Sequence, residues 1–288
     1  NLLLSQIVFG LCGGLTLMFI ASRLRMQLIR KNAFWIFVIS VALSLLVFVP
    51  GIGMEHGGAK RWIDLGITTF QPGELLKLGV IIYLATWLTL YKKRIHQPFF
   101  GIYPLLAVLG VACAVFIAQR DTGSFLITAF AGTAMYISAG ARWRDIGILI
   151  IIAAIGLGAL AQWRPYVLDR FSTLWRHDDL QGAGYQLNQS LIAIGSGEVA
   201  GRGYGKSIQK YNYLPEAHGD SIFAVASEEL GFIGSSFIVL LYILFGLRGL
   251  WISAHAEDVF GSLFVVGLVM IVVSQSFINI ASMLGLAP

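Results

Sequence analysis

The sequence predicts an all-α protein, a polytopic transmembrane helical bundle with about eight helices in this chain. Three observations predict this class. Hydrophobic residues make up 57% of the 288 residues, charged residues only 12%, and the mean hydropathy is +0.78, which is more apolar surface than a soluble core can bury. The apolar residues gather in runs long enough to cross about 30 Å of hydrocarbon. Basic residues recur between alternate runs.

The expected helices follow these runs in order. They cover roughly 2–22, 34–50, 73–91, 101–118, 123–140, 145–162, 221–246 and 259–285. The basic residues that mark one side are Arg23, Arg25, Arg30, Lys31, Lys92, Lys93, Arg94, Arg142, Arg144 and Arg248. By the positive-inside rule, this side is cytoplasmic. Because the chain begins and ends in apolar runs, we expect one membrane domain over 1–288 that is a portion of a longer protein.

One connection on the extracytoplasmic side, at 163–219, is much longer than the others. A connection of this length inside a compact fold is usually functional. Apolar residues recur at helical spacing over 166–176, which predicts a short helix lying in the membrane interface. A second short helix is predicted over 185–194, and the glycine-dense segment 195–207 follows it. Glycine lets the backbone approach a ligand closely.

Two local patterns carry no strong functional signal. The ending Gly205-Lys206-Ser207 superficially fits a phosphate-binding loop, but Ala200 stands where that motif needs its first glycine, and no strand is expected before it. A flexible basic loop is the favoured interpretation. Cys12 and Cys113 lie in apolar runs without the spacing of a metal site, so neither a disulfide framework nor zinc is predicted.

Four polar clusters fall on the extracytoplasmic side. They are 60–64, Glu74 with Lys77, 119–124 and 216–220. An ionisable pair inside a membrane-spanning run, such as Glu74 and Lys77, is by default a functional-site hypothesis. The cations suit phosphate or pyrophosphate, and the carboxylates can accept a proton. We therefore expect the four clusters to line one cavity.

Simpler interpretations stay open for these residues. Glu74 and Lys77, at i and i+3, also fit mutual neutralisation on a helix face. Asp121 and Asp220 each fit a helix cap, and Asp121 also fits a turn residue. His218 fits a polar loop residue.

Two further carboxylates, Glu228 and Glu229, lie inside the expected helix at 221–246. At 1.5 Å per residue they are about 12 to 14 Å into that helix. We expect them to face the protein interior, either in a structural hydrogen bond or in chemistry.

Five separated segments carry a resemblance that spans nearly the whole chain in order. They are 58–63 (GAKRWI), 70–77 (FQPGELLK), 182–186 (GAGYQ), 193–197 (AIGSG) and 213–220 (YLPEAHGD), the last followed by 226–231 (ASEELG). Together they resemble the SEDS family, which comprises FtsW- and RodA-type cell-wall proteins. The run at 214–218 is most similar to the division members of FtsW type.

The resemblance implies a ten-helix peptidoglycan glycosyltransferase, of which this chain holds roughly helices two to nine. Such a protein polymerises lipid II on the outer face of the bacterial cytoplasmic membrane, beside a class B penicillin-binding protein that crosslinks the strands. The family's essential aspartate maps onto Asp220, and its paired acid and base map onto Glu74 and Lys77. Two positions depart from the family: Arg120 stands where proline is usual, and Gly219 where threonine is common.

The expected chemistry starts with Asp220 as the catalytic residue. It takes the proton from the 4-hydroxyl of the acceptor sugar, and undecaprenyl pyrophosphate leaves, stabilised by cations of the site. No cofactor is certain; a divalent cation, Mg or Mn, is left open as a helper. The candidate substrate-binding residues are Lys60, Arg61, Glu74, Lys77, Gln119, Asp121, Gln189, Ser196, Arg202, Lys206, Lys210, Glu216 and His218.

Two other functions compete with this one. A lipid II flippase would use the same headgroup contacts without chemistry, because charged residues inside helices also mark transport pathways. A non-catalytic scaffold for a penicillin-binding protein needs none of these residues for chemistry. No nucleic-acid partner is expected, since the net charge of +5 follows from the cytoplasmic loops.

Overall fold

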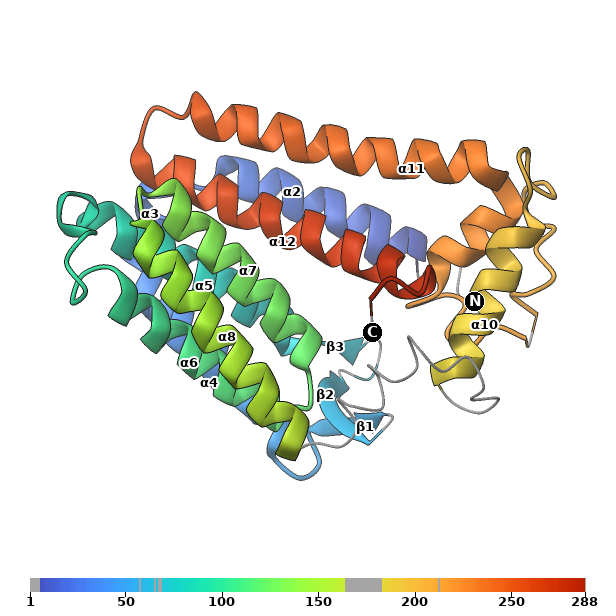
Figure 1. Ribbon diagram of the computed structural model, residues 1–288, viewed down its shortest axis with the longest axis horizontal. Helices are drawn as coiled ribbons and strands as arrows, with labels where there is room; N and C mark the ends of the chain where they lie inside the picture. The colour runs from blue at the N-terminus through green and yellow to red at the C-terminus, as the bar shows by residue number, and fades with distance from the viewer. Residues whose placement is uncertain are drawn as a thin grey trace. The chain divides into compact units, whose positions relative to one another are not determined.

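The computed structural model describes residues 6–56, 58–64, 66, 69–163, 183–211 and 213–287. Figure 1 shows the helices and strands along the chain. The chain divides into two compact units. The first unit is built from the described residues of Asn1–Thr128 and Glu257–Phe264. The second is built from those of Ala129–Ala256 and Val265–Pro288.

All eight runs predicted to span a membrane are helical. They are η1 (Gln6–Cys12) continued by α2 (Gly13–Arg23), α4 (Ala33–Leu45) continued by η2 (Leu46–Phe48), α5 (Pro72–Leu90), α6 (Ile102–Ala118), α7 (Thr122–Ser138), α8 (Trp143–Trp163), α11 (Ile222–Ala254) and α12 (Val259–Met283). The short helices α3 (Met26–Lys31) and η3 (Lys92–Arg94) lie in two of the connections that carry the basic residues. The second short helix predicted in the long connection is confirmed as α10 (Ala183–Ser196). The interfacial helix predicted over 166–176 lies outside the described residues.

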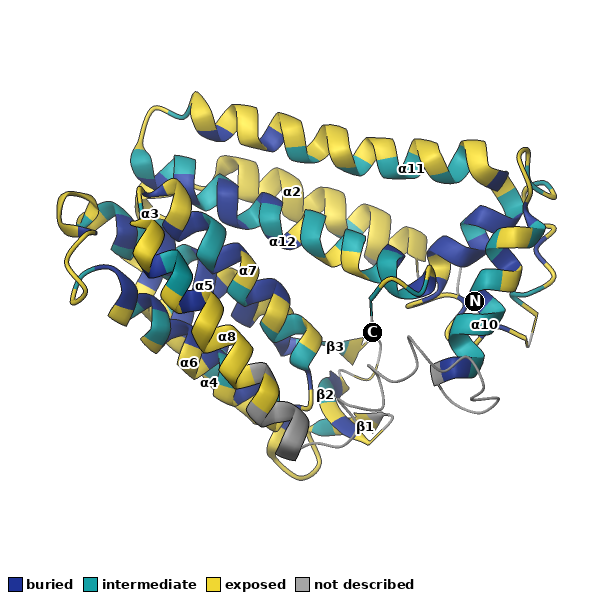
Figure 2. Cartoon of the chain, viewed as in Figure 1, coloured by how far each residue is buried: buried dark blue, intermediate teal, exposed yellow. Residues whose placement is uncertain are grey.

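Several helices present apolar side chains outward, as a membrane requires. Among the described residues, four helices are long and apolar enough to cross it: Gln6–Arg23, Pro72–Leu90, Ile222–Ala254 and Val259–Met283. The helix α2 has no buried residue, and most of α11 is exposed (Figure 2). Apolar surface of this extent is stable only when lipid or protein covers it.

The helix α5 forms the core of the first unit. Its apolar side chains Leu76, Val80, Ile81, Leu84, Ala85 and Leu88 are at most 1% exposed. The neighbouring helix α4 crosses α5 closely at Gly79, where a Cβ atom would lie 2.3 Å from the Ser40 hydroxyl oxygen. Lys77 is also buried in this helix.

A small antiparallel sheet between η2 and α5 was not predicted. Its strands are β1 (Gly53–His56), β2 (Ala59–Asp64) and β3 (Thr69–Phe70), in the order β1-β2-β3. Gly53 is required where β1 meets η2, because a Cβ atom there would lie 1.8 Å from the Val47 carbonyl oxygen. The polar cluster at 60–64, expected in a loop, therefore lies on β2.

The second unit is organised around the contact of α10 with the start of α11. Their shared apolar core contains Ala193, Leu214, Ala217, Phe223, Ala224, Val225, Ile280 and Met283. Residues of the long connection, of α11 and of α12 therefore pack together. This core lies directly beside Asp220, since the α11 residue Phe223 follows only three positions later.

The helix α11 is broken at Gly231. The backbone angles there are φ 67° and ψ −168°, a conformation that residues with a Cβ atom rarely adopt. The part before the break begins at Ile222, and the part after it extends from Phe232 to Ala254. At 1.5 Å per residue, the second part is about 34 Å long, which by itself crosses about 30 Å of hydrocarbon.

Candidate active site

The ion pair between Glu74 and Lys77 is present at the start of α5. Lys77 Nζ lies 2.8 Å from Glu74 Oε1, and the lysine side chain is 1% exposed while the glutamate is 48% exposed. An ammonium group removed from water needs a close partner. The arrangement supplies that partner, with the carboxylate reaching the surface. Glu74 and Lys77 therefore do neutralise each other as an ion pair on one helix. The predicted substrate role of both residues stays a prediction.

The turn from α6 to α7 is closed by Arg120 in a left-handed conformation, with φ 57°. The Arg120 N–H donates to the Ile117 carbonyl at 3.0 Å, and the Asp121 N–H donates to the Phe116 carbonyl at 2.8 Å. This pair of bonds is the Schellman helix ending, which usually has glycine at the left-handed position. Proline is fixed at negative φ, so the family's usual proline is incompatible with this backbone.

The same turn is tied to the sheet by arginine side chains. Arg61 on β2 donates from Nε to the Gln119 carbonyl at 3.3 Å and also donates to the Arg120 carbonyl. Arg120 in turn donates to the Gly58 carbonyl at 2.9 Å. The buried Gln119 amide donates to the Ser44 carbonyl at 2.7 Å. Arg61 therefore donates hydrogen bonds to the carbonyl groups left free at the end of α6.

Asp121 is the N-cap of α7, which confirms one of its two simpler interpretations. Its Oδ1 accepts the Ser124 N–H at 3.2 Å, and its Oδ2 accepts from the Gln71 amide at 3.4 Å. The side chain is buried. Lys60, by contrast, is exposed on β2, which leaves its ammonium group accessible to a ligand.

Asp220 lies at the entry to α11 and is exposed. The N-cap of that helix is Ser221, not Asp220. The Ser221 hydroxyl is buried, donates to the Pro215 carbonyl at 3.0 Å and accepts from the Gln186 amide at 3.1 Å. The Asn279 amide on α12 holds the backbone carbonyl of Asp220 at 3.1 Å. The main chain at Asp220 is therefore fixed while its carboxylate reaches solvent.

A cavity of about 570 Å³ opens beside this position, within the second unit. Its walls are the two parts of α11 and the end of α12, so the break at Gly231 shapes it. The lining residues are Gly219, Ile222, Phe223, Ala226, Ile238, Tyr242, Val272, Gln275, Ser276, Asn279 and Ile280. A Cβ atom at Gly219 would lie 3.6 Å from Glu216 Oε2, an ordinary contact, so the family's threonine would fit there.

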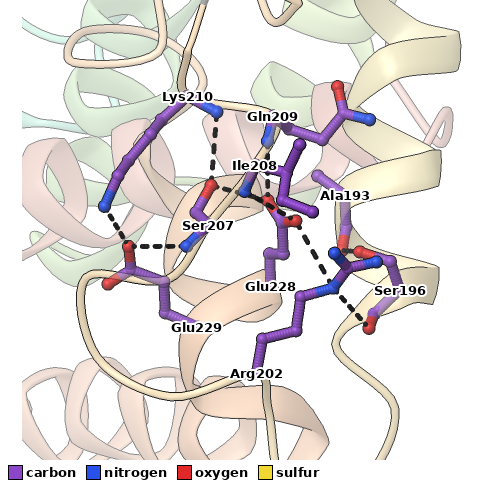
Figure 3. Close-up of polar contacts among 9 residues, drawn as sticks. All are labelled: Ala193, Ser196, Arg202, Ser207, Ile208, Gln209, Lys210, Glu228 and Glu229. Atoms are coloured by element: carbon purple, nitrogen blue, oxygen red, sulfur yellow. Dashed lines mark hydrogen bonds and ion pairs between the residues drawn. The ribbon is translucent and has the colours of Figure 1, made fainter.

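The two carboxylates of Glu228 and Glu229 fold the loop at 202–210 (Figure 3). Glu228 is fully buried, and its carboxylate accepts from the Ser207 hydroxyl at 2.6 Å and from the N–H groups of Ile208 and Gln209 at 3.1 and 3.2 Å. Arg202 Nε lies 3.6 Å from the same carboxylate. The expectation that Glu228 faces the interior is confirmed, and its contacts are structural hydrogen bonds.

Glu229 holds the other side of the loop. Its carboxylate accepts the N–H groups of Gly205 and Ser207 at 2.9 and 3.3 Å. Lys210 Nζ lies 2.7 Å away, and this hydrogen bond raises the pKa of the Lys210 ammonium above its ordinary value, against the opposing effect of burial. The loop's N–H groups thus cradle anions, as a phosphate loop does. The anions are the protein's own carboxylates, and the loop is fixed by hydrogen bonds rather than flexible.

Backbone hydrogen bonds join the loop to the break in α11. The N–H groups of Arg202 and Gly203 donate to the carbonyls of Glu228 and Glu229 at 3.0 Å each. In the reverse direction, the N–H groups of Phe232 and Ile233 donate to the carbonyls of residues 198 and 199 at 2.9 and 3.2 Å. The groups freed by the broken helix are therefore satisfied by the glycine-dense segment.

Glycine is required where these two segments touch. A Cβ atom at Gly201 would lie 2.2 Å from the Glu229 carbonyl oxygen, and one at Gly231 would lie 2.2 Å from the Gly201 nitrogen. A Cβ atom at Gly197 would lie 2.1 Å from the Ser227 carbonyl oxygen. At Gly197 and Gly201, the glycine-dense segment admits the backbone of α11, and its predicted approach to a ligand stays a prediction.

The remaining predicted residues of the second unit lie on α10, on the loop and before α11. Gln189 is half-buried on α10, and the Ser196 hydroxyl in its last turn donates to the Ala193 carbonyl. Glu216 and His218 are exposed before α11, and Lys206 is exposed on the loop. Among the described residues, Lys206 forms no ion pair, whereas Arg202 and Lys210 are each paired with a glutamate. Their roles toward substrate stay predictions.

The structure thus gathers the predicted residues into two groups. The first unit holds Lys60, Arg61, Glu74, Lys77, Gln119 and Asp121, and the second holds Gln189, Ser196, Arg202, Lys206, Lys210, Glu216, His218 and Asp220. The expectation that all of them line one cavity stays a prediction. Sequence reasoning missed Ser44 and Asn279, whose signal was an isolated polar residue near the end of an apolar run.

The described part of the chain contains no group of three or more His, Cys, Asp or Glu side chains that could hold a metal ion. Magnesium is often bound by one or two carboxylates together with substrate phosphates. A divalent cation that enters with the substrate would need only such a partial site, so the metal stays a prediction.

Comparisons with known proteins agree on the family. The family model of FtsW, RodA and SpoVE cell cycle proteins matches residues 1–288. The chain is 38% identical to stage V sporulation protein E of Bacillus subtilis over 252 residues, covering 87% of this chain and 69% of that protein. It is 34% identical to the probable peptidoglycan glycosyltransferase FtsW of Xanthomonas oryzae over 291 residues, covering 99% of this chain and 60% of that protein.

Solved structures confirm the fold. An aspartate-to-alanine mutant of the rod shape determining protein RodA from Thermus thermophilus superposes with a TM-score of 0.70 at 26% identity, covering 99% of this chain and 76% of that one. A chain from a peptidoglycan synthase complex that coordinates polymerization and crosslinking superposes with a TM-score of 0.81 at 24% identity, covering 100% of this chain and 81% of that one.

These findings confirm both the SEDS resemblance and the transmembrane helical bundle, and with the apolar helices they show a multi-pass membrane protein. The chain spans 60% to 69% of the length of the two relatives described above. Because the family model matches the whole sequence, the chain belongs to the FtsW, RodA and SpoVE family of cell cycle proteins.

Proposed function

We propose that this chain is the membrane domain of a peptidoglycan glycosyltransferase that polymerises lipid II into glycan strands. The observation that carries the proposal is the exposed Asp220 carboxylate, which stands on a fixed main chain beside the cavity lined by Gly219. Relatives of this chain that are named as probable peptidoglycan glycosyltransferases support glycosyl transfer as the reaction class. The substrate follows from the family resemblance.

In the proposed reaction, Asp220 is the general base. The 4-hydroxyl oxygen of the acceptor sugar forms a bond to the anomeric carbon of the growing strand, and its proton passes to the Asp220 carboxylate. The bond from that carbon to pyrophosphate breaks, and undecaprenyl pyrophosphate leaves with the electron pair. A direct displacement of this kind inverts the anomeric configuration.

The departing pyrophosphate needs positive charge near it. Lys206, on the loop of the second unit, is exposed and forms no ion pair among the described residues. Arg202 and Lys210 are neutralised by Glu228 and Glu229, so their main contribution is to the shape of the loop. We therefore assign the first contact with the leaving group to Lys206.

The location and partner follow from the same proposal. By the positive-inside rule, we assign the side of the basic loops to the bacterial cytoplasm and Asp220 to the outer side of the cytoplasmic membrane. A class B penicillin-binding protein would crosslink the strands that this domain makes. Cell division is favoured over elongation by the similarity to relatives of FtsW type.

A polymerisation assay on the full-length protein tests the proposal. Purified protein in detergent, given lipid II, should form glycan strands, and Asp220→Asn should bind lipid II but form none. A flippase would give no polymer in detergent, where no second leaflet exists. A scaffold would also give none without its partner, and strand synthesis by Asp220→Asn at the wild-type rate would refute the assignment of the base.

A further inference from the structure

We propose that Glu228 and Glu229 are positioning residues of the polymerisation reaction, acting through the loop at 202–210. The proposal rests on the function proposed above. Neither carboxylate contacts a substrate in this proposal, because N–H and O–H donors of the loop form hydrogen bonds with both. Their role is to give the loop one shape and to fix it to the helix segment that begins after Asp220.

The geometry of Glu228 supports the first step. Three donors and the Arg202 guanidinium converge on one buried carboxylate, and the donors come from three consecutive residues, 207 to 209. A carboxylate that accepts several hydrogen bonds in a buried setting is among the strongest local constraints a side chain can impose. Removing its charge would leave these donors competing for one weaker acceptor.

The second step is that the loop and the start of α11 form one body. Four backbone hydrogen bonds join 198–203 to both sides of the break at Gly231. The segment between Asp220 and this break has only ten residues, and its first turn is fixed by Ser221 and by Asn279. The loop is therefore held in one position relative to the entry of α11.

The third step concerns what the fixed loop presents. Both other cations of the loop, Arg202 and Lys210, are bound to the two glutamates. Lys206 lies between them in sequence and is exposed, and its stem lies near Gly203, where a Cβ atom would be 3.4 Å from the lysine Cδ. The glutamates thus use the flanking cations to hold the loop and leave the Lys206 ammonium for the pyrophosphate of the substrate.

Hydrogen exchange of the full-length protein in detergent tests the clamp without reference to activity. Glu228→Gln and Glu229→Gln should speed exchange of the amides at 203–210 by about tenfold, the effect of losing one charged hydrogen bond. Ser207→Ala removes the 2.6 Å bond to Glu228 and the 3.2 Å bond that the Ser207 hydroxyl accepts from the Lys210 N–H, but keeps the Glu228 charge, and it should speed exchange in the same direction. Glu198→Gln is the matched control, since this exposed carboxylate accepts no hydrogen bond among the described contacts. Unchanged exchange in Glu228→Gln overturns the clamp.

Kinetics then test whether the clamp positions Lys206. Glu228→Gln and Lys206→Ala should each raise KM for lipid II by about tenfold with a smaller change in kcat, whereas Asp220→Asn should abolish kcat. The double variant should be no worse than Lys206→Ala alone, because both substitutions remove the same contact. Additive effects on KM, or fast exchange with unchanged KM, overturn the positioning role. A wild-type protein that makes no polymer overturns the proposed function and leaves the exchange result to decide the clamp.

Discussion

Lys77 is buried to 1% exposure, and its partner Glu74, 2.8 Å away, is half exposed. The two ions therefore differ in what they lose when the pair is broken. The lysine would be left with its charge in the protein interior, while the glutamate would be solvated. This asymmetry makes the two residues unequal in stability experiments even though they form one contact.

Glu74→Gln should lower the melting temperature in detergent more than Lys77→Met does. Losing the carboxylate removes the Glu74 ion pair of a buried ammonium, at a cost of about 1 to 3 kcal/mol. Lys77→Met removes the charge and keeps much of the apolar stem. The double variant should therefore recover stability relative to Glu74→Gln, and a further loss in the double variant would contradict this account. Thermal unfolding followed by tryptophan fluorescence provides the measurement.

Arg120→Pro should destabilise the first unit, although proline is the family's usual residue there. The φ of 57° at this position lies far outside the range proline allows, and the expected cost is about 3 kcal/mol. Arg120→Gly removes the strain of a left-handed residue but also loses the bond to the Gly58 carbonyl, so we expect a change below about 1 kcal/mol. Equal stability of the two variants, compared by thermal unfolding, would show that the turn has another geometry.

Alanine at Gly201 or Gly231 should separate the glycine-dense segment from α11. Each added Cβ atom would lie 2.2 Å from a backbone atom of the other segment, and backbone cannot move aside cheaply. Gly195→Ala is the control, since no atom lies within 4 Å of its Cβ position and it lies in α10. Thermal unfolding should show a large loss for the first two and none for the control. A tolerated Gly231→Ala would mean that α11 is not broken.

The pair of Lys210 and Glu229 predicts a dependence of loop stability on alkaline pH. The hydrogen bond from Glu229 raises the Lys210 pKa above its ordinary value of 10.5. A group whose pKa is raised by folding contributes stability that is complete below the ordinary value and is lost as the pH rises through the folded value. Amide exchange at 203–210, corrected for the intrinsic rate, should therefore be constant below the ordinary value of 10.5 and become faster as the pH rises through the raised pKa of Lys210.

Lys210→Met should abolish this alkaline step, because the titrating group is gone. The variant should show faster exchange already at neutral pH. Lys206→Met is the matched control, since the exposed Lys206 forms no ion pair among the described residues, and it should keep the step. An alkaline step of equal size in Lys210→Met would assign the titration to another group.

The membrane spans could be predicted from sequence because each depends on composition over many residues. The runs at 73–91 and 259–285, for example, became α5 and α12 with ends shifted by at most two residues. The sheet was missed because its longest strand, β2, has six residues and lies in a connection rich in glycine. Short strands of this kind depend on partners distant in sequence, which no local pattern reports.

The candidate site was predicted less completely, for reasons that differ between residues. The partner of Lys77 was found because the two residues are three positions apart. The partners of Glu228 are about twenty positions away in the loop, and only the fold brings them together. The break at Gly231 was invisible because a glycine among apolar residues leaves the hydropathy of the run unchanged. The left-handed Arg120 was likewise hidden, since arginine does not mark such a turn.

The break in α11 also separates membrane anchoring from the positioning of the main chain near Asp220, which one continuous helix would combine. The stretch after Gly231 is long enough to anchor the protein in the bilayer. The nine helical residues before Gly231 therefore do not need to span the membrane. This segment before the break, which begins next to Asp220, is joined instead to the glycine-dense segment at 198–203. The length of the membrane anchor and the placement of the Asp220 main chain therefore depend on different stretches of one helix.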